Sequence, residues 1–193
     1  MNHLHDVELA KAYRLLNHGP VTLVTFEHEG AGNVMAASWV MPLDFDPPKL
    51  ALVLDRNTYS RGLLEGSGTF VINLPGRQQA ELTLAVGNCS GQAQDKFAQF
   101  GITPQRAKAV QAPIVPGCLA YLECRVIEEP GLQQRHDLFV AEVVAAYADE
   151  RAFSNGRWHF PDDELRTLHY SAGGTFYPTG NPFKVTIPAG VDD

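Results

Sequence analysis

The sequence predicts a mainly β protein in which about six antiparallel strands close into a barrel with short helices at its periphery. Runs of β-branched and apolar residues recur along the chain, and hairpin turns and short helical insertions separate them instead of regular βαβ units. The 193 residues suit one domain with a real core, and 45% of them are apolar. We therefore expect a single domain over residues 1–193, with the barrel at about 19–149 and an arm at about 150–193.

The chain begins with a candidate helix and a candidate hairpin. Apolar residues at helical spacing predict a short amphipathic helix over residues 6–16, capped by Asp6. Residues 21–26 are rich in β-branched and apolar side chains, residues 29–32 supply turn chemistry, and residues 33–41 resume an extended apolar run. These three segments predict a β-hairpin.

Strands and short helices alternate in the middle of the chain. Pro47 and Pro48 exclude a helix and lead into a buried strand at residues 49–54, after which Asn57 or Thr58 can cap a helix. The later segments are a strand at 69–74 and helices at 78–86 and 94–100.

Two longer strands come late in the chain. In residues 119–128 apolar and polar side chains alternate, which predicts one buried face, and residues 137–147 form the second strand. Gly and Pro then interrupt the sequence repeatedly, so we predict an irregular arm that lies over the barrel or over a partner subunit.

Composition and motifs exclude several classes of function. The formal net charge is −7, and no cluster of Lys and Arg offers a positive surface to nucleic acid. No apolar run approaches the ~20 residues of a membrane span, so we expect a cytoplasmic protein without a membrane partner. The three cysteines form no CxxC pair, and no metal site is predicted. The motifs GxSxG, GxxxxGK and GxGxxG are absent, which removes the usual support for a hydrolase, P-loop or Rossmann protein.

Residues 56–60 form the first candidate site, at the start of a helix. Unpaired backbone N–H groups there combine with hydroxyl groups and with the guanidinium of Arg56, an arrangement that can hold a small phosphate. An ordinary strand-to-helix connection, with Thr58 as the cap and Arg56 in solvent, would have the same pattern. Spacing alone leaves both interpretations open.

Residues 33–39 form the second candidate site. Small residues let a flat molecule approach this strand, and Asn33 and Ser38 can hydrogen-bond to it, which suits a planar heteroaromatic ring. A barrel strand with alanines chosen for tight packing and Trp39 as a core aromatic is the alternative.

Lys96 and His136 are two further candidates. Lys96 could lie beside a bound anion, and His136 could titrate near neutral pH. Side chains of these types are more often simply solvated.

Taken in order, segments from about residue 19 to about residue 149 resemble one known family. They are Pro20-Val21-x-Leu23-Val24-Thr25, Gly32-Asn33-x-Met35-x-Ala37-Ser38-Trp39, Pro47-Pro48-x-Leu50-Ala51-Leu52, Arg56-Asn57-x-Tyr59-Ser60, Phe70-Val71-Ile72-Asn73-Leu74-Pro75, Ser90-Gly91-x-x-x-Asp95-Lys96-Phe97, Ala112-Pro113, Leu122-Glu123-Cys124-x-Val126 and His136-x-x-Phe139-Val140-x-Glu142-Val143. Their order and spacing resemble the flavin reductase-like, FMN-binding split-barrel family, and within it the flavoredoxin-type branch.

The resemblance implies an antiparallel split β-barrel that binds FMN. The residues implied to contact the isoalloxazine ring are Asn33, Met35, Ala36, Ala37, Ser38 and Trp39, and those implied to hold the phosphate are Arg56, Asn57, Tyr59 and Ser60, supported by Lys96. Ser60 stands where the flavoredoxin branch often has Thr, which keeps the hydroxyl group.

The resemblance also implies an oxidoreductase that works as a homodimer. NADH or NADPH would reduce the flavin, and the electrons would pass to free flavin, a partner oxygenase or another acceptor. His136 is then a candidate contact for the nicotinamide or for a proton, and Tyr170, Phe176 and Tyr177 are candidate covers of the flavin. Two alternatives stay open: an electron-transfer module reduced by a protein donor without a nicotinamide site, and a flavin-free barrel kept for its partner interactions.

Overall fold

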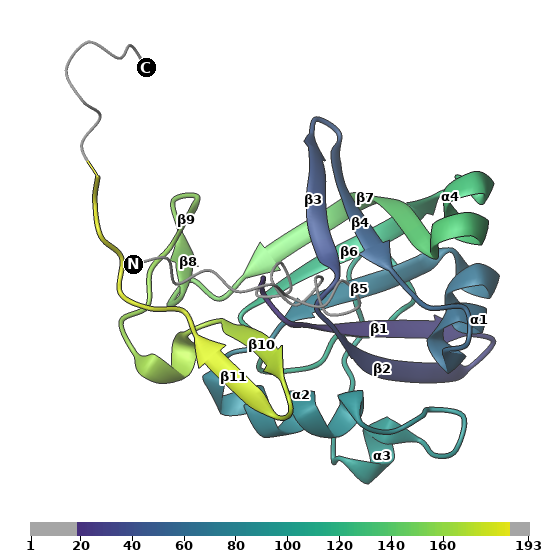
Figure 1. Cartoon of the computed structure of the whole chain (residues 1–193), viewed down its shortest axis with the longest axis horizontal. Coiled ribbons are helices and arrows are strands. Elements are labelled where there is room, and N and C mark those ends of the chain that lie inside the picture. The colour runs from purple at the N-terminus through teal and green to yellow at the C-terminus, as the bar shows by residue number, and fades with distance from the viewer. Residues whose placement is uncertain (1–18, 186–193) are drawn as a thin grey trace, which may run out of the picture.

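The computed structural model describes residues 19–185, and the helix expected over residues 6–16 lies outside them. Its main feature is a seven-stranded antiparallel sheet with the strand order β2-β1-β5-β6-β7-β4-β3 (Figure 1). The strands are β1 (Thr22–His28), β2 (Ala31–Ala37), β3 (Val40–Phe45), β4 (Pro48–Val53), β5 (Thr69–Leu74), β6 (Ala120–Ile127) and β7 (Leu138–Ala148).

The sheet closes on itself because its two outermost strands are consecutive in the chain. Only Ser38 and Trp39 separate the end of β2 from the start of β3. The three Cα–Cα steps from Ala37 to Val40 span at most about 11 Å, so the two edges of the sheet meet there. The hairpin of β3 and β4 then projects from the rest of the barrel (Figure 1). The predicted antiparallel split barrel is confirmed, and we call the Ser38–Trp39 junction the seam.

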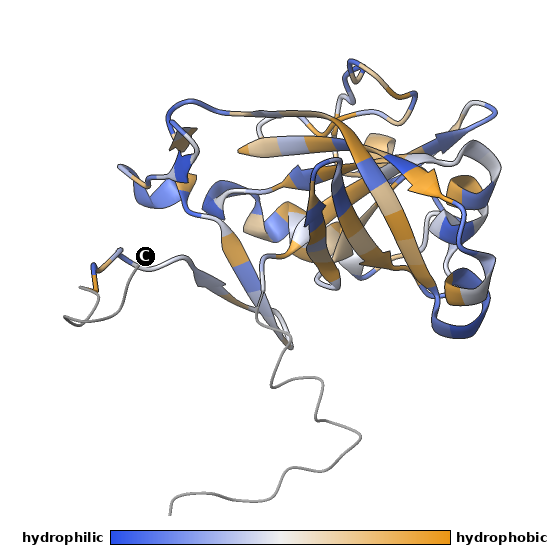
Figure 2. Cartoon of the chain, turned by 90° about the horizontal axis from the view of Figure 1, so that it is seen from above, coloured by the Kyte–Doolittle hydropathy of each residue, from blue (hydrophilic) through white to orange (hydrophobic). Residues whose placement is uncertain are grey.

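Apolar side chains from most strands meet inside the barrel. Phe26, Leu52, Phe70 and Phe139 come from four different strands and are almost fully buried in one cluster. A second cluster around Leu23 covers the outer face of the β1–β2 hairpin. Figure 2 shows hydrophobic residues concentrated along the strands of the barrel.

Short helices cover the ends and one side of the barrel. They are α1 (Tyr59–Ser67), α2 (Ala80–Gly87), α3 (Lys96–Gln99) and α4 (Pro130–His136), with a 3-10 turn at Arg77–Gln79 before α2. Gly68, at φ 64°, ends α1 in the left-handed conformation that glycine favours. The three helices predicted in the middle of the chain are confirmed. The sequence-based reading missed α4 because Pro130 and Gly131 resemble a turn, whereas proline also suits the first position of a helix.

The extended run at residues 33–41 is two strands and not one. Thr22, the first residue of β1, pairs with Ala37, and Pro20, the preceding residue of the same parity, has no N–H to donate to a longer β2. Without a partner the chain leaves β1 after Ala37, crosses the seam and pairs with β4. The single-strand prediction for this segment is therefore wrong.

β6 is covered on both faces near Glu123, which corrects the prediction of one buried face. Glu123 is completely buried on the outer side, where its carboxylate accepts hydrogen bonds from the backbone N–H groups of Lys108, Ala109 and Val110 and from the hydroxyl of Tyr147. Four donors compensate the burial of the charge. This carboxylate attaches the loop before β6 to the barrel.

The arm after β7 is more regular than predicted. It contains two small hairpins, β8 (Phe153–Ser154) with β9 (Arg157–Trp158) and β10 (Leu168–Ala172) with β11 (Thr175–Pro178), and a 3-10 turn at Asp163–Leu165. Gly173 and Gly174 form the turn of the second hairpin, and Pro178 ends β11. Turns and irregular segments connect these hairpins, so the predicted arm stands and the two hairpins refine it.

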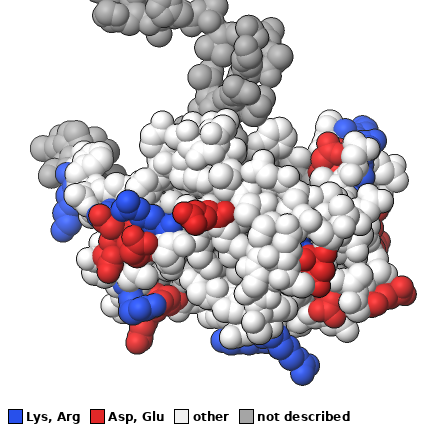
Figure 3. Space-filling view, turned by 90° about the horizontal axis from the view of Figure 1, so that it is seen from below, with Lys and Arg blue, Asp and Glu red and all other residues white. Residues whose placement is uncertain are grey.

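The described surface shows no dominant sign of charge in the view of Figure 3. Acidic and basic side chains form small mixed clusters around a broad uncharged area. Within residues 19–185 the structure has no helix long and apolar enough to cross a membrane.

Candidate functional site

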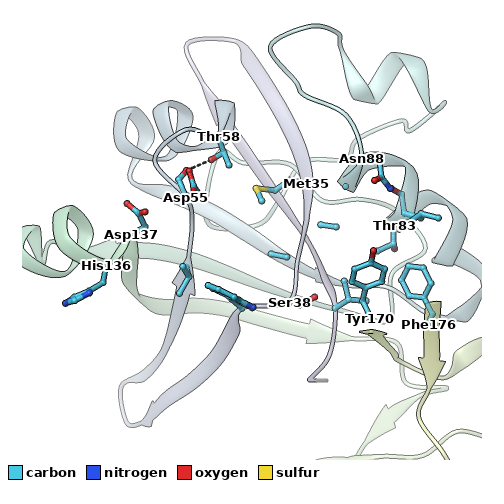
Figure 4. Close-up of a pocket in the computed structure, with 17 residues that line it drawn as sticks. Met35, Ser38, Asp55, Thr58, Thr83, Asn88, His136, Asp137, Tyr170 and Phe176 are labelled. Atoms are coloured by element: carbon cyan, nitrogen blue, oxygen red, sulfur yellow. Dashed lines mark hydrogen bonds between the residues drawn. The ribbon is translucent and has the colours of Figure 1, made fainter. Parts of the chain in front are cut away.

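A cavity of about 560 Å³ opens at the seam of the barrel (Figure 4). Its lining is Val21, Met35, Ala36, Ala37, Ser38, Trp39, Val53, Asp55, Thr58, Thr83, Leu84, Gly87, Asn88, His136, Asp137, Tyr170 and Phe176. The volume lies in the range of roughly 300–1,000 Å³ typical of small-molecule sites. We call this space the ring cavity.

Small side chains make the floor of the ring cavity flat. β2 passes beneath it with Ala36 and Ala37, and α2 packs so closely on β2 that a Cβ at Gly87 would lie 3.2 Å from Ala36 Cβ. A planar molecule can therefore lie against this strand without meeting a large side chain.

β2 also offers hydrogen-bonding groups to the ring cavity. It is an outermost strand, so every second residue turns its backbone N–H and C=O away from β1. Val34 O is such a group, because it accepts a hydrogen bond from Lys96. The alternation along an antiparallel strand turns the N–H and C=O of Ala36 the same way, and Ser38 follows just beyond the end of β2.

A second cavity of about 490 Å³ continues the ring cavity toward the start of α1. Met35, Ala36, Thr58, Gly87 and Asn88 line both spaces. The other lining residues are mostly polar or small: Asn33, Asn57, Tyr59, Ser60, Val86, Cys89, Ser90, Gly91 and Lys96. We call this space the anion cavity for the reasons that follow.

The first turn of α1 presents unused hydrogen-bond donors to the anion cavity. The Thr58 side chain does not cap the helix, because its hydroxyl donates to Asp55 O at 2.8 Å. Among the described residues, no group accepts from the backbone N–H of Tyr59 or Ser60. Free N–H groups and the helix dipole together attract an anion.

Lys96 places a buried positive charge at the same cavity. Its side chain comes from α3, where Asp95 caps the helix by accepting from the N–H groups of Phe97 and Ala98. The ammonium donates to Val34 O at 3.0 Å and to Val86 O at 2.7 Å, and no carboxylate among residues 19–185 pairs with it. Burial lowers the pKa of Lys96. A buried ammonium with a third donor and no counter-ion favours a bound anion.

Asn33 and Gly91 shape the floor of the anion cavity. The amide of Asn33 donates to Ser60 Oγ at 2.8 Å, and both residues are buried. Gly91 packs so tightly that an added Cβ would lie 2.3 Å from Asn33 Oδ1 and 2.9 Å from the Tyr59 ring. Only glycine fits at position 91 while this floor is kept.

Arg56 is the one predicted phosphate contact that the structure does not bring into either cavity. Its guanidinium pairs with Asp137 at 3.2 Å and donates to Gln134 O at 2.7 Å. The side chain therefore joins the start of α1 to α4. Asn57 reaches the anion cavity, where its backbone N–H and one of its two side-chain amide N–H groups donate to Asp55 Oδ1 at 2.7 and 3.0 Å.

His136 lines the opposite end of the ring cavity, beside Asp137 and Asp55. It is the last residue of α4 and not the first of a strand, and Asp137 follows it at φ 55°. Its ring points away from the centre of the cavity (Figure 4). Two arginines, Arg56 and Arg61, outweigh the effect of burial and lower the pKa of Asp137. The Asp137 carboxylate at this end is thus paired with arginines, whereas the Lys96 ammonium at the other end has no carboxylate partner among residues 19–185.

The structure brings ten of the eleven predicted cofactor contacts to the two cavities, with Arg56 as the exception. Sequence reasoning missed the wall that α2 provides, from Thr83 to Asn88, because its face carries no chemical motif. It noticed Ser90 and Gly91 as part of a motif without assigning them to the site. Of the three aromatic residues considered in the arm, Tyr170 and Phe176 line the ring cavity, and Tyr177 does not.

Comparisons with known proteins agree with this geometry. A family model described as "Flavin reductase like domain" matches residues 14–176. The crystal structure of an FMN-binding domain of a flavin reductases-like enzyme from Shewanella baltica OS155 has a TM-score of 0.84 at 47% identity, covering 93% of this chain and 96% of that one. Flavoredoxin of Desulfovibrio vulgaris (Miyazaki F) has a TM-score of 0.81 at 25% identity, covering 98% of this chain and 100% of that one.

A relative with a named role comes from Rhodococcus opacus. It is the reductase component of 4-nitrophenol 4-monooxygenase/4-nitrocatechol 2-monooxygenase, and it is 30% identical over 151 residues, which cover 76% of each chain. The family match spans the barrel, both cavities and the β10–β11 hairpin as far as Phe176. This chain therefore belongs to the flavin reductase-like family and has flavoredoxin as a structural neighbour.

Proposed function

We propose that this protein is an FMN-dependent oxidoreductase that holds the isoalloxazine ring in the ring cavity and the phosphate in the anion cavity. The observation that carries the proposal is the buried ammonium of Lys96, which faces the uncapped start of α1 without a counter-ion among the described residues. A dianionic phosphate would complete both features. The residues shared by the two cavities would border the ribityl chain.

The chain's own groups would hold the ring in place. When bound, FMN supplies the chemistry, since its ring can take a hydride, which is two electrons and one proton, from a reduced nicotinamide and pass the electrons to an acceptor. The outward N–H group of Ala36 and the polar groups of Ser38 just beyond the end of β2 would donate to the polar edge of the ring, and such bonds tune its redox properties. Trp39 and α2 would keep water from its faces.

NADH or NADPH is the donor we propose, as in a flavin reductase. The relative from Rhodococcus opacus supports this choice, because its name describes a reductase component of a monooxygenase. His136 lies at the rim of the ring cavity. After a side-chain rotation it would contact a nicotinamide or exchange a proton with the site. An electron-transfer module with a protein donor is the second candidate, supported by the likeness to flavoredoxin.

Two measurements test the proposal. Protein reconstituted with FMN should be yellow, release flavin on denaturation, and bind FMN more tightly than riboflavin in equilibrium dialysis. The loaded protein should then oxidise NADH or NADPH in steady state. A protein that fails to bind FMN would refute the proposed function, whereas FMN binding without nicotinamide oxidation would favour the electron-transfer module.

We also propose a homodimer, with a second copy covering β3. Trp39 at the seam and Met41, Leu43 and Phe45 on β3 are 50%, 56%, 46% and 97% exposed, and a register shift between Pro42 and Asp44 divides them between the two faces of the hairpin. Edge strands with such apolar residues are usually paired or covered. Because Trp39 also lines the ring cavity, a second copy on this strand would close the site from outside.

A further inference from the structure

We propose that Tyr170 and Phe176 position a second flat nitrogen-containing ring, which meets the bound flavin, and so determine which ring the site accepts. The inference rests on the proposed function, because it takes the flavin ring to lie over β2. The second ring can come from two sources, the nicotinamide of a donor or the isoalloxazine of a free flavin.

The two aromatic side chains form one preformed surface. Tyr170 and Phe176 are directly opposite each other in the β10–β11 register, and their ring centroids lie 5.1 Å apart at an angle of 52°. Both rings are half-buried and line the ring cavity. Figure 4 shows them side by side next to α2, on the other side of Ser38 from Asp55 and His136. A tilted pair with free faces can receive a third ring by stacking or edge contact.

Bonds at the base of the hairpin hold this surface in place. The N–H of Val21 donates to Leu168 O at 2.8 Å, so β10 is attached to the start of β1. The N–H of Thr179 donates to Thr167 O at 2.9 Å, and Arg166 donates to Thr179 O at 2.8 Å. Rings held by a fixed backbone lose little entropy when a ligand binds.

The hairpin tip is fixed against the wall of the cavity. Ala172, Gly173 and Gly174 have φ values of 104°, 62° and 80°, a tight turn that glycine favours. A Cβ at Gly174 would lie 3.7 Å from Leu84 Cδ2, so the tip is next to α2. The hairpin thus joins the barrel at its base and α2 at its tip, and its aromatic pair spans this end of the ring cavity.

The pair lines the ring cavity but not the proposed phosphate site, because neither residue lines the anion cavity. The phosphate and ribityl chain would occupy the anion cavity and the residues shared by both cavities, and neither Tyr170 nor Phe176 is among them. The flavin ring would rest on β2. We therefore assign the aromatic pair to the second ring and not to the cofactor.

Tyr177 provides a matched control on the same hairpin. It is next to Phe176 in the chain but on the opposite face of β11, where it is 59% exposed and lines no described cavity. Tyr170→Ala, Phe176→Ala and Tyr177→Ala each remove one ring from one small hairpin. Tyr170→Phe removes the hydroxyl and keeps the ring, and Phe176→Leu serves as a milder variant if Phe176→Ala fails to fold.

The test measures binding to the FMN-loaded protein with two unreactive probes. Tetrahydro-NADH represents the nicotinamide source and lumichrome the flavin source, and the absorbance of bound FMN reports their Kd values. We expect Tyr170→Ala and the Phe176 variants to raise the Kd of at least one probe about five- to tenfold, the loss of one stacking partner and its buried area. Tyr170→Phe and Tyr177→Ala should change it less than about twofold.

The outcomes separate this inference from the proposed function. Equal probe affinities in the wild type and the Tyr170 and Phe176 variants would overturn the inference, and so would a wild type that binds neither probe. A parallel loss of FMN affinity, measured by dialysis, would also overturn it, because the pair would then contact the cofactor. A wild type that does not bind FMN would instead overturn the proposed function. The probe that responds identifies the source of the ring.

Discussion

The side-chain amide of Asn33 donates a hydrogen bond to Ser60 Oγ at 2.8 Å, and this bond joins the strand beneath the flat cavity to the first turn of α1. Because the Asn33 amide supplies the proton, the Ser60 hydroxyl keeps its own proton for another acceptor. One interaction thus orders both halves of the proposed FMN site. It also indicates which variants should weaken the binding of the phosphate without weakening the binding of the ring.

Ser60→Ala should weaken FMN by about 1 kcal/mol, because one hydroxyl contact to the phosphate is lost. Riboflavin has no phosphate, so its affinity should hardly change. Fluorescence quenching titrations of both flavins into both proteins measure the difference. Equal losses for the two ligands would mean that Ser60 acts only by supporting Asn33.

Arg56→Ala tests a residue for which the sequence and the structure predict different effects on FMN affinity. From the sequence alone, loss of this guanidinium should weaken FMN by about 2–3 kcal/mol. In the structure the guanidinium pairs with Asp137 and Gln134 O, outside both cavities. We therefore expect FMN affinity to fall by less than about 1 kcal/mol, as for an exposed ion pair. A loss of about 2–3 kcal/mol for FMN, with no matching loss for riboflavin, would show that Arg56 turns to the phosphate on binding.

Lys96→Met should weaken FMN binding and leave the stability of the apo protein nearly unchanged. FMN affinity should fall by roughly 2–3 kcal/mol, because the hydrogen bond to a charged phosphate is lost. The apo protein should keep its stability within about 1 kcal/mol, since methionine replaces a buried charge that lacks a counter-ion. Thermal unfolding of both apo proteins, with FMN titrations, checks the two expectations. A strongly destabilised apo variant with unchanged FMN affinity would contradict the role given to Lys96.

Glu123→Gln should change how stability depends on pH. Burial alone would raise the pKa of Glu123, but the N–H groups of residues 108–110 and the Tyr147 hydroxyl outweigh it, and the pKa is lowered. A carboxylate with a lowered pKa contributes stability above its unfolded value, near 4.5, and loses that contribution as the pH falls through its folded pKa. The wild type should exceed the variant in stability at pH 7 and lose this advantage on acidification.

Urea unfolding of both proteins from pH 7 to pH 3 measures this change. Glu142→Gln, an exposed carboxylate on β7, is the control and should shift stability by less than about 0.5 kcal/mol at any pH. A difference between wild type and Glu123→Gln that stays constant over this pH range would contradict the charge-based explanation.

Phe45→Asp should dissociate the proposed homodimer. A side chain that is 97% exposed in one copy would carry its charge into an apolar interface of well over ~1,000 Å². Sedimentation at micromolar concentration should show a dimer for the wild type and a monomer for the variant. Phe183→Asp in the arm, at an 86% exposed position, is the control and should remain dimeric. A monomeric wild type with bound FMN would refute the homodimer.

Local patterns were sufficient where neighbours in the chain decide the structure. The run at residues 69–74 is strand β5 with the same bounds, and the helix expected after Asn57 or Thr58 is α1. Turn residues, strand-length apolar runs and helix caps act over a few residues, so the sequence contains the information directly. The resemblance to the flavin reductase-like family rested on the spacing of such segments, and the family match confirms it.

Contacts between distant residues decided the rest. Residues 33–41 look uniformly extended, yet the strand ends at Ala37 because β1 has no further residue to pair with it. Arg56 looks free for a phosphate, but Asp137, 81 positions later, takes its guanidinium. Lys96 looks like a surface lysine and is buried against Val34 O and Val86 O. The sequence by itself determined the strands, the first turn of α1 and the family. The tertiary structure decided which polar groups reach the cavities and which are already paired, because pairing depends on distances that no local pattern contains.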